Sequence, residues 1–126
     1  MTLDQLLAAI NDGSMLPPEV YSELDLDTIL DTRDSNEVFE QSWLLASAEI
    51  SQRWDVAPHY RETEMLVETI RKQSFMQVSG ATHQHEIASY VSDDFELIAK
   101  AIALNLKNAF VSHMFECYCK HHVFLP

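Results

Sequence analysis

The sequence predicts an all-α protein that folds as one domain, and three observations lead to this prediction. Apolar residues recur at helical spacing along most of the chain, and no stretch shows the alternation typical of a strand. The chain has only two glycines and four prolines, whereas the turns of sheet-rich folds need glycine. A length of 126 residues with 47% hydrophobic content suits a single core. We therefore expect one helical domain over residues 1–126, arranged as a bundle of five or six helices.

Helix caps and prolines divide the first part of the chain. Thr2 and Gln5 have the spacing of a capping box, so we expect a first helix that ends at the turn residues 11–13. The Pro-Pro pair at 17–18 permits a new helix to start, since proline is well accommodated in a first turn. A short helical piece is therefore expected to extend to about residue 30.

Two longer helices are expected next. Asp34 and Glu37 form a second capping-box pattern, and apolar residues recur at helical spacing behind it. This pattern predicts a helix over residues 36–54. A fourth helix is expected over residues 58–76, and the Ser-Gly-Ala sequence at 79–81 interrupts the chain after it.

The C-terminal third is expected to contain the longest helix. A short helix over residues 83–91 comes first. Asp93 and Glu96 then give a third capping box, which predicts a helix from Asp94 to about Lys120. Apolar side chains lie on more than one side of this helix, so we expect a long C-terminal helix packed at the centre of the bundle.

Two histidines and a cysteine near the C-terminus leave two interpretations open. His113 and Cys117 fall within the apolar stripe of the last predicted helix, and His121 lies at its edge. Free cysteine behaves as a small hydrophobe, which favours a place in the core. The spacing of i, i+4 and i+8 also lets neighbours share one helix face, and both residue types bind zinc well. The alternative is therefore a small metal- or thiol-dependent protein in which these three residues hold zinc.

The charge balance excludes several classes of function. The chain has 20 acidic and 8 basic residues, a formal net charge of −12, so it repels nucleic acids and anionic membranes. No nucleotide-binding run and no complete catalytic motif is present, which favours a binding protein without a cofactor over an enzyme. The N-terminal residues lack a signal-peptide pattern, and Cys117 and Cys119 lie on different sides of one helix, where they cannot bridge. We therefore expect a reducing, cytoplasmic location.

Acidic residues are concentrated in one part of the chain, residues 19–40, which we call the acidic segment. It carries eight carboxylates against Arg33 alone, so its 22 residues supply −7 of the total charge of −12. The segment also contains enough apolar residues to fold. We expect its charged residues and one aromatic anchor to contact a partner: Glu19, Tyr21, Glu23, Asp25, Asp27, Asp31, Asp34, Glu37 and Glu40.

A folded acidic surface fits a basic protein partner, because complementary charges accelerate association. We therefore expect an acidic protein-binding module, a stoichiometric inhibitor of a basic protein such as a toxin or a nuclease. In charge and size the chain is analogous to toxin-neutralising immunity proteins and antitoxins. The alternative is that the acidic residues only keep the protein soluble. Phe39, Trp43 and Trp54 leave open whether they line the core or a homodimer face.

Overall fold

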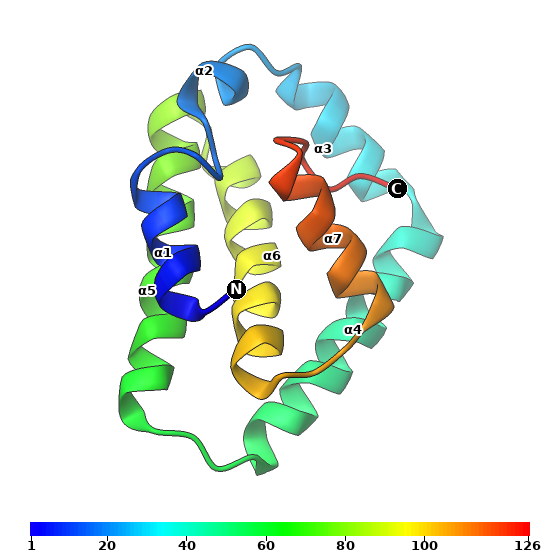
Figure 1. The fold of residues 1–126 in the computed structure, drawn as a ribbon. Helices are drawn as coiled ribbons and strands as arrows, with labels where there is room; N and C mark the ends of the chain where they lie inside the picture. Colours follow the sequence, from blue (N-terminus) through cyan, green and yellow to red (C-terminus); the bar gives the residue numbers. More distant parts are fainter.

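A computed structural model describes residues 1–126, and its fold consists of seven helices without strands (Figure 1). The prediction of a single all-α domain is confirmed, whereas the number of helices is seven rather than five or six. The helices in chain order are α1 (Leu3–Asn11), α2 (Pro18–Tyr21), α3 (Leu26–Ser35), α4 (Glu37–Val56), α5 (Arg61–Thr82), α6 (His85–Leu104) and α7 (Ala109–Cys119).

Side-chain caps explain where several helices begin. The predicted capping box is present at α1, where the Thr2 hydroxyl accepts from the Gln5 backbone N–H. Asp25 caps α3, so the segment expected as one helical piece is divided into α2 and α3. Asn36 caps α4 by accepting from the Phe39 N–H at 2.8 Å. Each cap satisfies an N–H group that has no partner within its own helix.

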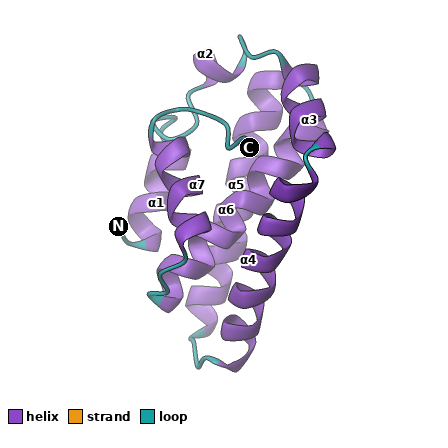
Figure 2. Cartoon of the chain, turned by 90° about the vertical axis from the view of Figure 1, so that its right-hand side faces the viewer, coloured by secondary structure: helices purple, strands orange, loops and turns teal.

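The central helix of the bundle is α6. It runs beside α5 in the opposite direction, and α4 and α7 pack against its other sides (Figure 1). The first two helices lie against α5. When the molecule is turned, α3 and α4 are seen to form one side of it (Figure 2). None of the seven helices combines the length and the apolar composition that a bilayer crossing requires.

The long C-terminal helix expected from Asp94 to Lys120 is not formed. Instead α6 ends at Asn105, whose φ of 51° lies in the left-handed region that asparagine tolerates better than most residues. A new helix begins after Asn108, whose side chain accepts from the Val111 N–H at 3.0 Å. The predicted capping box at Asp93 therefore lies inside α6 rather than at a helix start.

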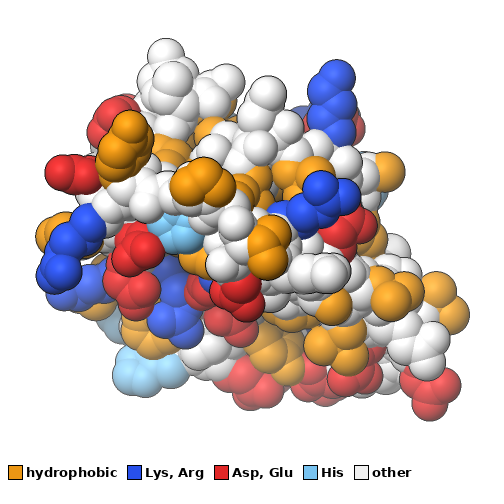
Figure 3. Space-filling view, turned by 90° about the horizontal axis from the view of Figure 1, so that it is seen from below, with side chains coloured by type: hydrophobic (Ala, Val, Ile, Leu, Met, Phe, Trp, Pro, Cys, Tyr) orange, Lys and Arg blue, Asp and Glu red, His pale blue; other side chains and the backbone are white.

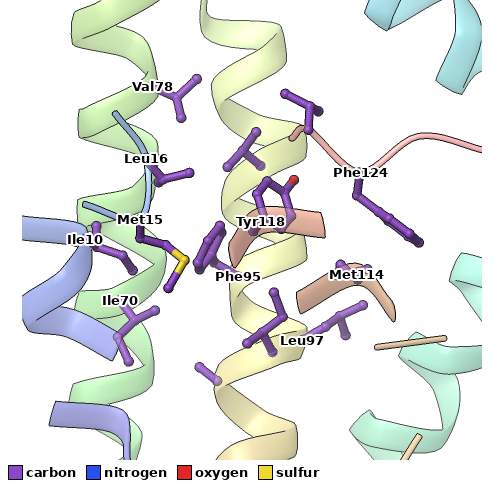
Figure 4. Packing of buried hydrophobic residues seen from close by; sticks show 14 of the residues in the cluster. Ile10, Met15, Leu16, Ile70, Val78, Phe95, Leu97, Met114, Tyr118 and Phe124 are labelled. Carbon is purple, nitrogen blue, oxygen red and sulfur yellow. The ribbon is translucent and has the colours of Figure 1, made fainter. Parts of the chain in front are cut away.

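This break changes which side of the last helix faces the core. Met114 and Tyr118 are buried, together with Val111, whereas His113 is exposed and Cys117 is only half-buried. The ring of Tyr118 packs against that of Phe95 on α6, with centroids 4.8 Å apart (Figure 4). A continuous helix would have carried the apolar stripe of α6 onto His113 and Cys117, and the turn at 105–108 removes that continuity.

The chain after α7 also belongs to the core. Phe124 belongs to the buried cluster drawn in Figure 4. Its ring lies 5.2 Å from that of Phe39 and 5.1 Å from that of Phe110. Val123 beside it is buried as well. The C-terminal residues therefore hold α4 and α7 together through aromatic packing, which contributes beyond the buried area alone.

Candidate partner-binding site

The acidic segment extends over α2, α3 and the first turn of α4, and it is an exposed surface. All eight of its carboxylate residues are exposed: Glu19, Glu23, Asp25, Asp27, Asp31, Asp34, Glu37 and Glu40. Arg33 is the exception in both charge and position, because it is buried and points inward. The segment therefore presents its acidic groups to solvent and keeps its single cation inside.

Tyr21 is not available as an aromatic anchor for a partner. Its side chain is only 1% exposed, and its hydroxyl is buried without a hydrogen-bond partner. Burial, together with the nearby Asp94 carboxylate, raises the pKa of Tyr21 well above its ordinary value. The sequence showed an aromatic residue among charged ones, but the apolar face of α2 turns it into the core.

A buried charged cluster holds the acidic segment to the rest of the domain. The carboxylate of Asp94 on α6 is 0% exposed, and it accepts two hydrogen bonds from the guanidinium of Arg33, at 2.8 and 3.1 Å. It also accepts from Trp43 Nε1 at 2.8 Å and from the Tyr118 hydroxyl at 2.5 Å. These four residues, here called the Asp94 cluster, join α3, α4, α6 and α7.

The Asp94 cluster is stable as a unit because its two buried charges compensate each other and are joined by two hydrogen bonds. Burial alone would lower the pKa of Arg33, but the adjacent Asp94 carboxylate raises it above the ordinary value. Burial, reinforced by the same carboxylate, raises the pKa of Tyr118. Removing one member of a buried ion pair typically costs about 3–5 kcal/mol, since the other charge is left without compensation. The cluster thus fixes how α3 and α4 sit on α6.

A cleft of about 380 Å³ opens above the Asp94 cluster, between α3, α4 and α6. Three carboxylates and three aromatic rings account for most of its lining. We call it the acidic–aromatic cleft, and its lining residues are Arg33, Asp34, Phe39, Glu40, Trp43, Leu44, Tyr90 and Asp93. Arg33 and Trp43 also belong to the Asp94 cluster, so the base of the cleft is held by buried hydrogen bonds.

The walls of the cleft are connected to each other. The Tyr90 hydroxyl donates to the Asp34 carboxylate across the boundary between α6 and α3. This hydrogen bond, with a smaller effect of burial, raises the pKa of Tyr90 to about 12. The guanidinium carbon of Arg33 lies 5.0 Å from the centroid of the Tyr90 ring and 5.2 Å from that of Phe39. Both distances are within the range of cation–π attraction.

The cleft brings together only part of the predicted contact set. Asp34 and Glu40 line it, whereas the other exposed carboxylates of the acidic segment lie outside it. Asp94 was not predicted as a site residue, because the capping-box pattern at Asp93 and Glu96 placed it at a helix start. A signal was present: Asp94 lies three residues after Val91 and four before Ile98, so a continuous helix puts it in an apolar stripe. A carboxylate in that position needs a buried cation.

The zinc alternative is not supported by the geometry. Cys117 Sγ lies 3.9 Å from His113 Nε2, but Cys117 is half-buried against the core, His113 is exposed, and His121 lies beyond the end of the helix. No group of three or more His, Cys, Asp or Glu side chains is placed to hold a metal ion. The His113 ring instead packs edge-on against Phe124, with centroids 5.7 Å apart.

An exposed acidic surface beside a cleft is the kind of surface that a protein partner can recognise through complementary charge. Residues 5–124 match the family described as immunity protein PIM1, which covers nearly the whole chain, and the chain belongs to this family. Membership implies that the protein binds a partner toxin. No curated protein matches the sequence.

Proposed function

We propose that this immunity protein neutralises a basic toxin, with a nuclease as the leading candidate, by binding it stoichiometrically through the acidic segment. The observation that carries the proposal is the separation of charge within that segment. Its eight carboxylates are exposed, and its one cation, Arg33, is buried in an ion pair with Asp94. The exposed surface of the segment is therefore more acidic than the sequence count suggests.

Such a surface has a physical cost in the free protein. Like charges repel each other in the folded state, and the segment has no exposed cation to relieve that repulsion. A partner with clustered lysines and arginines relieves it on binding. Complementary potentials also steer the encounter and raise the association rate by one to three orders of magnitude at low salt.

A nuclease is a suitable target on chemical grounds. Proteins that bind nucleic acids do so largely through lysine and arginine side chains that contact phosphates. An acidic inhibitor is attracted to the same cations and competes with the nucleic acid for them. The chain carries free thiols at Cys117 and Cys119, which favours the cytoplasm, where thiols stay reduced, as the place of neutralisation.

The test begins with capture of the partner. The tagged protein is expressed in its native host, retained material is compared at low and high salt, and the retained toxin is purified. Association rates are then measured for the wild type and for a variant with Asp25, Asp27 and Asp31 changed to lysine. We expect association to slow by about tenfold or more at low salt.

The matched control reverses three exposed carboxylates outside the acidic segment and away from α4, Glu62, Glu68 and Glu116, and so changes the net charge equally. We expect it to slow association much less, because these residues lie away from the proposed contact surface. Equal slowing in both variants would show that only net charge matters. A toxin bound with no dependence on salt would refute the electrostatic proposal.

A further inference from the structure

We propose that the acidic–aromatic cleft receives an arginine side chain of the partner toxin, and that exposed apolar residues of α4 cover the chain on either side of that arginine. The inference rests on the proposed function for the identity of the partner as a basic toxin. It goes beyond that function because it assigns one pocket, one type of side chain and a flanking contact surface.

The charge in the cleft is not balanced by the chain itself. Asp34, Glu40 and Asp93 line the cleft, and Asp34 and Glu40 have no ion-pair partner. The nearest cation to Asp93 is Arg71, whose Nη2 lies 3.7 Å from Asp93 Oδ1. Arg33 also lines the cleft, but its positive charge is already compensated by its ion pair with Asp94. Asp34 and Glu40 therefore have no counter-charge within the chain, and a cation from a partner can supply it.

The aromatic walls favour a guanidinium over an ammonium. Arg33 already lies over Phe39 and Tyr90 at 5.2 and 5.0 Å, which shows that rings in this cleft are placed to attract a guanidinium. Trp43 adds the aromatic side chain that attracts cations most strongly. A planar guanidinium stacks on such rings and forms paired hydrogen bonds with a carboxylate, which a compact ammonium cannot do as well.

The apolar part of the surface lies on α4 next to the cleft. Val38 is 75% exposed, Leu44 55% and Leu45 73%, and Leu44 also lines the cleft. Val38 and Leu45 are seven residues apart and therefore lie on the same side of the helix. In the space-filling view, acidic side chains gather along one edge of the molecule and hydrophobic side chains lie next to them (Figure 3). Contiguous exposed apolar groups mark interaction sites, here for a segment with apolar residues beside its arginine.

The cleft is also formed before the partner arrives. Trp43 is held by its hydrogen bond to Asp94, and Tyr90 by its hydrogen bond to Asp34. Side chains that are already ordered lose little conformational freedom on binding, which favours affinity. Asp94 thus supports the cleft from beneath and does not itself line it.

The first experiment uses a small probe and is independent of the toxin. The ¹⁵N-labelled protein is titrated with N-acetyl-arginine methylamide, and the indole N–H resonances of Trp43 and Trp54 are followed. Trp54 lies outside the cleft and serves as the internal reference. We expect a saturable shift of Trp43 with a dissociation constant on the order of millimolar, and no comparable shift of Trp54.

Variants and a neutral probe make this result specific. Changing Glu40 to glutamine should weaken probe binding by about fivefold or more, a loss of roughly one kcal/mol. The same change at exposed Glu49 on α4, outside the cleft, should have no effect. The citrulline analogue keeps the shape of arginine without the charge. If it shifts Trp43 equally, or if arginine gives no saturable shift, the proposal is wrong.

The second experiment uses the purified toxin and separates the two proposals. Changing Asp34 to Asn together with Glu40 to Gln removes two charges in the cleft, and changing Glu19 and Glu23 to Gln removes two outside it. We expect the cleft pair to raise the dissociation rate by about tenfold or more, whereas the outer pair changes mainly the association rate. Equal dissociation rates would refute the cleft while leaving the acidic surface in place. If neither pair changes any rate, both proposals fail.

A second copy of this chain is the competing occupant of the apolar surface. Sedimentation of the free protein, with and without a Leu45 to Glu change, distinguishes the two. We expect a monomer in both cases and weaker toxin binding by the variant. A dimer that the change dissociates would assign the α4 surface to self-association, and so overturn this part of the inference.

Discussion

Replacing Arg33 by methionine tests whether the Asp94 cluster holds the domain together. The change keeps an unbranched side chain of similar reach and removes the guanidinium that donates to Asp94 at 2.8 and 3.1 Å. The carboxylate remains 0% exposed and keeps only the hydrogen bonds from Trp43 and Tyr118. The folded state then contains a buried negative charge without a counter-charge. In the unfolded state water solvates the same carboxylate, so the change destabilises the folded state.

The expected loss of stability is about 3–5 kcal/mol, the range for breaking a buried ion pair by removing one partner. A domain of this size has a free energy of unfolding of roughly 5–15 kcal/mol, so about a fifth or more of the stability would be lost. The midpoint of thermal unfolding should fall by about 10–20 °C. Most of this loss comes from burying a carboxylate without a counter-charge. The net contribution of the intact ion pair to stability is smaller.

Urea unfolding followed by far-ultraviolet circular dichroism measures the effect. We expect a lower midpoint with an unchanged slope, since the surface exposed on unfolding stays the same. Arg53 to Met is the matched control, because Arg53 is exposed on α4 and forms no ion pair. Its cost should stay within about 0.5 kcal/mol.

A double-mutant cycle distinguishes charge pairing from simple loss of packing. Asp94 to Asn alone leaves Arg33 buried beside a neutral amide, and we expect a loss similar to that of the arginine variant. The double variant has neither charge, and the amide oxygen still accepts a hydrogen bond. Its loss should be smaller than the sum of the two single losses by about 2 kcal/mol. Additive losses, or an Arg33 variant as stable as the Arg53 control, would refute the reasoning.

Three further predictions follow from the buried side chains and the absence of an assembled metal site. Burial raises the pKa of Tyr21 and Tyr118, so above their ordinary value of about 10 the native state holds protons that the unfolded chain releases. Stability should therefore be fully present below about pH 10 and fall as the pH rises further, and urea midpoints that stay constant to about pH 11 would contradict this. Phe124 to Ala should cost about 3–5 kcal/mol in urea unfolding, since the ring is buried between α4 and α7, and a loss below about 1 kcal/mol would mean that the tail is not part of the core. Zinc should neither raise the unfolding temperature nor bind at one equivalent in calorimetry, and binding that is abolished by a Cys117 to Ala change would show that the metal site exists after all.

The sequence predicted the class of fold because helical periodicity is a local property. Thr2 and Gln5 identified the start of the first helix correctly, since a capping box depends on residues three apart. The break at Asn105 was not predicted, because Leu104 and Leu106 on either side continue an apolar pattern. Its signals are conformational, a left-handed asparagine and an asparagine cap without the expected acidic partner.

The exposed carboxylates of the candidate site were predicted from the sequence, whereas the buried residues beneath them were not. Exposed carboxylates follow from composition alone, and all eight lie on the surface. The Asp94 cluster depends on partners 24, 51 and 61 residues away along the chain, and no local pattern specifies which of them meet. Tyr21 shows the same limit, because Glu19 and Glu23 lie on either side of it in the sequence, yet its side chain is buried in the fold.

The central claim is that the toxin binds at the acidic segment and the adjoining cleft. Hydrogen–deuterium exchange of the protein, free and in complex with the captured toxin, tests it most directly. We predict that protection on binding is concentrated in α3 and in the first half of α4, which together carry most of the acidic and apolar residues of the proposed surface. Protection confined to α5 or α7, with α3 and α4 unchanged, would place the toxin elsewhere and contradict the account.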